Sequence, residues 1–325
     1  MIKYLKLIRL HNLLMVPLTM YLLRYGIIKP ALDYGYTFVI GERVSLQFPD
    51  NLFLIVVIIN MLLGAAGYVI NDYFDRKIDA INKPDELIIG KTVDRRFAII
   101  LHWVLNGIAI ILAGYLSWVM RKPVVLLIYM MIAGVFWLYS TTYKKQFLIG
   151  NIVVAMGTAM IPLQLAYFEI ISLNQAYGEQ LIMHGASFKT LFYWIVAFAF
   201  FAFLTNFLRE IIKDIEDFEG DRSYGCNTLP VVTGIKTAKI VSIVLVAVII
   251  WFLSFAYYKY LDDPISKIYL LTTVVVPLIA VAVLTAIAKT VKNYATISII
   301  IKIIMLMGVL YAVVAKYIMV YNFTV

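Results

Sequence analysis

The chain has 325 residues, of which 63% are hydrophobic and only 14% are charged, and its formal net charge is +9. Its mean hydropathy of +0.91 excludes a soluble globular domain, whose surface needs more charged side chains. Apolar stretches of about 20 residues recur along the chain, and a helix needs this length to cross a bilayer. We therefore predict an all-α integral membrane protein. The single cysteine, Cys226, excludes an intramolecular disulfide and a cysteine-rich metal site.

The hydropathy pattern predicts about nine transmembrane helices in a single domain that spans residues 1–325. In chain order they lie near residues 10–28, 52–72, 97–118, 123–140, 148–169, 190–212, 238–258, 268–288 and 295–320. Residues 1–145 and 146–290 each contain four of these helices, and both sets start on the same side of the membrane. We therefore expect two parallel four-helix repeats followed by a ninth helix.

The basic residues gather at the N-terminus and in alternate loops. The predicted loop at 26–51 is poorer in base and carries Asp33, Glu42 and Asp50. By the positive-inside rule, we expect an integral protein of the cytoplasmic membrane with its N-terminus in the cytoplasm. The net positive charge then reflects topology, so nucleic acid is not expected as a partner.

Two acidic motifs of the same pattern, D-x-x-D-x-x-x-D, lie at the ends of the predicted helices 52–72 and 190–212. They consist of Asp72, Asp75 and Asp79, and of Asp214, Asp217 and Asp221. On a helix, offsets of three and seven residues place all three carboxylates on one face. These carboxylates repel one another, and the negative end of the helix dipole adds to the repulsion. Two such faces in one cavity would form an oxygen-rich site for Mg²⁺ and, through Mg²⁺, for a diphosphate.

These motifs resemble the two signatures of the UbiA-type intramembrane prenyltransferases, and the likeness covers nearly the whole chain. Within that family the chain is most similar to the branch of geranylgeranylglycerol-phosphate geranylgeranyltransferases. The stretches that support this are 9–14, 139–145, 150–151 and 209–214. The resemblance implies a Mg²⁺-dependent enzyme that transfers a prenyl group from an allylic prenyl diphosphate to a lipophilic acceptor in the membrane. In that branch the donor is geranylgeranyl diphosphate and the acceptor is geranylgeranylglyceryl phosphate. The positive-inside rule independently places both aspartate motifs, and with them the expected active site, at the cytoplasmic boundary.

The resemblance also implies roles for individual residues. The metal-binding set is Asn71, Asp72, Asp75, Asp79, Asp214, Asp217 and Asp221. The catalytic set is Asp72, Asp75, Asp214, Asp217, Arg76 and Lys144, in which the two cations stabilise the charge on the departing diphosphate. The residues expected to contact substrate are Arg9, Asn12, Tyr139, Tyr143 and Asn151.

Two alternative functions remain open at this point. One is an aromatic prenyltransferase that acts on a quinone precursor, since the same diphosphate site serves different acceptors. The other is a cation-coupled membrane transporter that uses the carboxylates as a translocation site. Carboxylates at one membrane boundary favour the enzyme, whereas carboxylates at the bilayer midplane favour transport.

Overall fold

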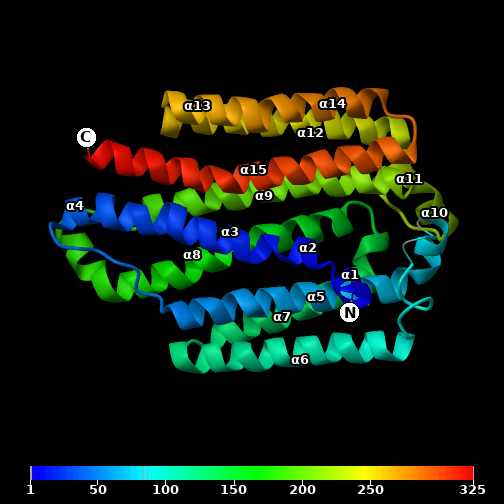
Figure 1. The fold of residues 1–325 in the computed structure, drawn as a ribbon, viewed down its shortest axis with the longest axis horizontal. Helices are drawn as coiled ribbons and strands as arrows, with labels where there is room; N and C mark the ends of the chain where they lie inside the picture. Colours follow the sequence, from blue (N-terminus) through cyan, green and yellow to red (C-terminus); the bar gives the residue numbers. More distant parts are fainter. Residues whose placement is uncertain (1, 83, 86, 325) are drawn as a thin grey trace. The chain divides into compact units, whose positions relative to one another are not determined.

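The computed structural model describes residues 2–82, 84, 85 and 87–324, and this part of the chain is almost entirely helical (Figure 1). Eight of the described helical segments are long and apolar enough to cross a bilayer, which confirms the predicted all-α membrane architecture. They are α5 (Asp50–Asn82), α6 (Arg95–Met120), α7 (Pro123–Thr141), α8 (Ile149–Met183), α9 (Lys189–Glu216), α12 with η4 (Ile235–Leu261), α13 through α14 (Pro264–Ile287) and α15 (Val291–Thr324).

The remaining predicted span, 10–28, is helical but is not one regular α-helix. It comprises α2 (Leu10–Leu13), α3 (Met15–Leu23), the π-helices η1 (Arg24–Ile28) and η2 (Ala31–Tyr36), and α4 (Thr37–Ile40). The prediction of a loop at 26–51 is therefore wrong as far as Ile40. Lys29, Pro30 and Asp33 resemble loop residues in sequence, but the helix continues through Pro30, which lies between the two π-helices.

The chain forms two compact units, of which the first comprises residues 1–17, 50–153 and 217–232. Here α5, α6 and α7 pack side by side (Figure 1). A smaller buried cluster joins α1 (Ile2–Leu7) to α5, the loop after α5 and the start of α6. Its members are Leu7, Val69, Ile89, Val93 and Ala98. Burial of these apolar side chains fixes the N-terminal segment against α5, where the first aspartate motif lies.

The second unit comprises residues 18–49, 154–216 and 233–325, and α9 packs against α12 and α15 within it. Arg24 of η1 and Glu169 of α8 form a fully buried ion pair in this unit, with Nε and Oε1 2.6 Å apart. Arg24 also donates a hydrogen bond to the carbonyl oxygen of Phe48. Because a buried charge must be paired, Glu169 fixes the irregular N-terminal helix against α8. The predicted repeats, 1–145 and 146–290, stay a prediction.

Candidate active site

The first aspartate motif lies on an unbroken stretch of α5. The helix continues to Asn82, so Asp72, Asp75 and Asp79 share one face, as their spacing predicts. Asp75 is buried, and the side-chain amide of Asn71 donates a hydrogen bond of 2.7 Å to its Oδ2 atom. The buried carboxylate therefore has a fixed orientation within the first unit.

Two basic side chains form ion pairs with carboxylates of this motif. The ammonium group of Lys144 forms an ion pair with Asp75. The guanidinium of Arg9 lies 2.7 Å from Asp72 Oδ1 and 5.0 Å from the centroid of the Tyr68 ring. Lys144 lies in the short helix η3 (Tyr143–Lys145) between α7 and α8. Both cations offset the repulsion between the carboxylates of α5.

The backbone of Arg9 is strained. It has φ 49° and ψ 52°, in the left-handed region, which costs a residue other than glycine about 1–2 kcal/mol. Two residues earlier, Leu7 is packed in the buried cluster, which fixes the chain on this side of Arg9. The strain accompanies a side chain directed at Asp72, and strained residues often occur at functional sites.

The second motif is divided by a helix end. Helix α9 ends at Glu216, and α10 (Phe218–Ser223) begins after Asp217, which has φ −91° and ψ 9°. The expectation of one continuous helical face for the second motif is therefore wrong. Asp214 belongs to the second unit, whereas Asp217 and Asp221 belong to the first unit together with the α5 motif.

Asn82, the last residue of α5, provides the physical reason for this break. Its side-chain oxygen accepts a 2.8 Å hydrogen bond from the Gly220 N–H group, and its amide donates to the Asp217 carbonyl at 3.1 Å. The Gly220 N–H is one of the amides at the helix start that have no partner within the helix. Asn82 thus caps α10 from another helix, and the Asp217 side chain does not cap it. Sequence analysis missed Asn82 because an asparagine beside a proline-containing loop is typical of a turn.

The two motifs influence each other electrostatically within the first unit. Asp221 is 8% exposed. Burial and the neighbouring Asp217 carboxylate raise the pKa of Asp221 to about 6, and Asp75 adds to this rise. The Lys144 ammonium lowers the same pKa. The charges of both Lys144 and Asp75 therefore affect the pKa of the Asp221 carboxyl group in α10.

The position of Lys144 depends on close backbone packing. A Cβ atom on Gly150 would lie 2.8 Å from Lys144 Cα and 3.1 Å from the Tyr143 carbonyl oxygen. On the other side of the turn, the Asn227 N–H donates a 2.8 Å hydrogen bond to the carbonyl of Lys145. The turn that presents Lys144 is therefore fixed between the start of α8 and the loop after α10.

We expect Gly150→Ala to displace the Lys144 turn, because a backbone atom cannot move aside as a side chain can. The overpacking should cost about 1–3 kcal/mol of unfolding free energy and lower enzymatic turnover. The control is Gly178→Ala in the same helix, where an added Cβ meets nothing within 4 Å. Thermal unfolding in detergent measures the stability of both variants. A Gly150→Ala variant as stable and active as Gly178→Ala would contradict this account.

The other predicted site residues are spread over the first unit. Arg76 packs against the loop that follows α5. A Cβ atom added to Gly90 of that loop would lie 3.2 Å from Arg76 Cδ. Asn151 is buried near the start of α8. The half-buried predicted residues are Asn12 of α2, Tyr139 of α7 and Tyr143 of η3.

The types of side chain at the site fit Mg²⁺, which prefers carboxylate and amide oxygens. Over the described residues, no three His, Cys, Asp or Glu side chains lie close enough to hold one metal ion. Lys144 and Arg9 instead hold the carboxylates of Asp75 and Asp72. The Oδ1 atom of Asn71 is buried and, within the part of the chain described, has no hydrogen-bond partner. This carbonyl oxygen, beside Asp75, is available to coordinate a cation.

The fold and the site define an integral membrane protein in which carboxylates near the end of the long helix α5 are paired with basic side chains. The model of the UbiA prenyltransferase family matches residues 37–296 of the chain. The chain therefore belongs to the UbiA prenyltransferase family and is a membrane-embedded prenyltransferase. This confirms the resemblance inferred from the two aspartate motifs.

Individual relatives agree with this assignment. The digeranylgeranylglyceryl phosphate synthase of Thermococcus sibiricus is 31% identical, over 67% of this chain and 71% of that protein. The enzyme of the same name from Thermococcus gammatolerans is 35% identical, over 64% of this chain and 67% of that protein. The predicted likeness to this branch of the family is confirmed.

Solved structures confirm the fold. A structure of digeranylgeranylglyceryl phosphate synthase aligns with a TM-score of 0.58 at 22% identity, covering 96% of this chain and 98% of that chain. A UbiA homologue from Archaeoglobus fulgidus, bound to DMAPP and Mg²⁺, aligns with a TM-score of 0.54 at 15% identity. That alignment covers 96% of this chain and 99% of the homologue.

Proposed function

We propose that the enzyme transfers a geranylgeranyl group from geranylgeranyl diphosphate to geranylgeranylglyceryl phosphate, releasing diphosphate. The names of the curated relatives support this choice of substrates. The observation that carries the proposal is that carboxylates of both motifs occur in one compact unit with two cations. In α5, Asp72 is paired with Arg9 and Asp75 is paired with Lys144. The charge of Asp75 also raises the pKa of Asp221 in α10.

In the proposed reaction, the bond between C1 of the prenyl chain and the diphosphate oxygen breaks, and the electron pair leaves with the diphosphate. The acceptor hydroxyl oxygen forms a new bond to C1, and its proton is released together with the diphosphate. Mg²⁺ bound by the aspartates would stabilise the negative charge of the leaving group as a Lewis acid. The UbiA homologue from A. fulgidus is bound to both DMAPP and Mg²⁺. The Asp75 carboxylate is buried, which limits the access of water to this part of the site.

Lys144 and Arg9 have two roles in this proposal. Before the substrate binds, each cation neutralises a carboxylate that would otherwise be repelled by its neighbours. With the metal-bound diphosphate in place, the same ammonium and guanidinium groups donate hydrogen bonds to diphosphate oxygens. Charge-assisted hydrogen bonds of this kind stabilise a leaving diphosphate more strongly than neutral ones.

The location of the motif along α5 supports an enzyme rather than a transporter. Asp72 lies 22 residues after the first residue of α5, Asp50, which corresponds to about 33 Å along a helix. The hydrocarbon core of a bilayer is about 30 Å thick, so the carboxylates fall near a membrane boundary. With the basic residues Lys144 and Lys145 beside them, we propose that the site and the N-terminus face the cytoplasm.

Incubation of the purified enzyme with geranylgeranyl diphosphate and Mg²⁺ tests the choice of acceptor. We expect mass spectrometry to show that geranylgeranylglyceryl phosphate gains one geranylgeranyl group. A hydroxybenzoate presented in a parallel reaction should stay unmodified. Prenylation of the hydroxybenzoate alone would identify an aromatic prenyltransferase and contradict the proposed acceptor.

A further inference from the structure

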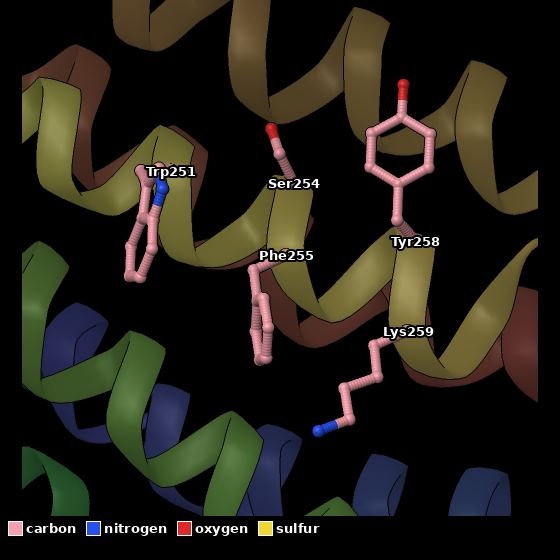
Figure 2. Close-up of a pocket in the computed structure, with 5 residues that line it drawn as sticks. All are labelled: Trp251, Ser254, Phe255, Tyr258 and Lys259. Carbon is pink, nitrogen blue, oxygen red and sulfur yellow. The ribbon is translucent and has the colours of Figure 1, made fainter.

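A row of side chains on α12 and η4 faces a shallow hollow at one end of the second unit. Figure 2 shows that Trp251, Phe255 and Lys259 point to the same side of the helix, whereas Ser254 and Tyr258 point away from it. These five residues line the hollow, which has a volume of about 520 Å³. The spacing of four residues along the row repeats the helical turn.

The row is apolar along its length and carries a charge at its end. The rings of Trp251 and Phe255 are stacked, with centroids 6.0 Å apart and an angle of 16° between their planes. The ammonium nitrogen of Lys259 lies 5.3 Å from the Phe255 centroid and 5.5 Å from that of Tyr260. Trp251 is 61% exposed and Phe255 is 47% exposed, so protein covers neither ring fully. Within the described residues Lys259 forms no ion pair with an acidic side chain.

The lysine at the other end of the same helix provides a contrast. Lys239 donates hydrogen bonds to the carbonyl oxygens of Ala286 and Ala288, at the end of α14. Lys239 and Lys259 are 20 residues apart, or about 30 Å along a helix, which is the thickness of the hydrocarbon core. Lys259 therefore lies at the level of the lipid headgroups, and the two rings lie below it at the level of the acyl chains.

We propose that this row is a binding site for an anionic phospholipid of the surrounding bilayer. The lipid phosphate pairs with the Lys259 ammonium, and an acyl chain lies along the stacked rings of Trp251 and Phe255. Charge complementarity identifies the headgroup, because the Lys259 ammonium lies over two aromatic rings and, among the described residues, is paired with no carboxylate. The exposed apolar surface identifies the rest of the ligand, because it continues directly into the hydrocarbon. This site is separate from the residues proposed for prenyl transfer.

Fluorescence quenching in vesicles tests the proposal, with Trp251 as the probe. The full-length enzyme is reconstituted into phosphatidylcholine vesicles that contain the same fraction of either brominated phosphatidylglycerol or brominated phosphatidylcholine. The difference in quenching between the wild-type enzyme and Trp251→Phe isolates the signal of Trp251. We expect about a fivefold preference for phosphatidylglycerol at this position, as one lysine near an anionic lipid provides.

Two variants, each lacking one positive charge, distinguish a specific lipid-binding site from general electrostatic attraction of anionic lipids to the protein. Lys259→Gln should abolish the preference for phosphatidylglycerol. Lys267→Gln removes a charge from an exposed lysine of α13 outside the hollow and should retain it. Equal quenching by both lipids, or a preference that survives Lys259→Gln, would overturn the proposal. Weak quenching by both lipids would also overturn it, because a protein surface would then cover the row.

Discussion

Asp75→Asn and Asp217→Asn should each lower prenyl-transfer turnover at least tenfold, which corresponds to about 1.4 kcal/mol of activation free energy. Asparagine keeps the size of the side chain but removes a charge that we propose binds the metal. Asp72→Asn and Asp214→Asn should have the same effect. Steady-state turnover at saturating Mg²⁺ and prenyl diphosphate measures each loss.

Glu219→Gln is the matched control for these variants. Glu219 lies between Asp217 and Asp221 in sequence, but it is exposed, whereas Asp221 is buried. Its neutralisation should therefore change turnover only slightly. Equal losses in Asp217→Asn and Glu219→Gln would show that general negative charge, rather than the position of the motif carboxylates, supports activity.

Lys144→Gln should lower turnover about 100-fold, as does the loss of one donor to a developing anion in other enzymes. The variant also leaves the buried Asp75 carboxylate without its ammonium partner, which should destabilise the protein. Combining Lys144→Gln with Asp75→Asn should restore thermal stability, since no charge then stays unpaired, but it should not restore turnover.

The neighbouring Lys145→Gln variant is the control for the role of Lys144. Lys145 occupies the same short helix, but its side chain is exposed. Turnover should stay close to that of the wild-type enzyme. Equal effects at Lys144 and Lys145 would indicate a general contribution of basic charge at this end of the protein and would contradict a specific contact with diphosphate.

The helical architecture and the first motif could be predicted from sequence because both depend on local patterns. Apolar runs of fixed length determine which segments cross a bilayer, and the spacing of Asp72, Asp75 and Asp79 determines their common face. The pairing of Lys144 with Asp75 could not be predicted, because it depends on how η3 packs against α5 in three dimensions. The resemblance to a family pointed to Lys144 as a diphosphate contact without revealing this pairing.

The irregular parts of the chain show where sequence patterns fail. The second motif has the same spacing as the first, yet its helix ends at Glu216 because Asn82, far away in sequence, caps α10. The ion pair of Arg24 and Glu169 was also missed. Both residues interrupt apolar stretches, and a charged residue in a membrane segment is a signal that a buried partner exists. Which residue is that partner depends on tertiary packing.

The dependence of turnover on Mg²⁺ tests the central claim most directly, namely that the aspartate motifs bind a metal that holds the diphosphate. The wild-type enzyme is assayed with prenyl diphosphate and acceptor in excess EDTA and again after Mg²⁺ is added back beyond the chelator. Because the leaving group is stabilised through the metal, we expect no product in EDTA and full recovery with Mg²⁺. Full turnover in excess EDTA would contradict the proposed role of the aspartates.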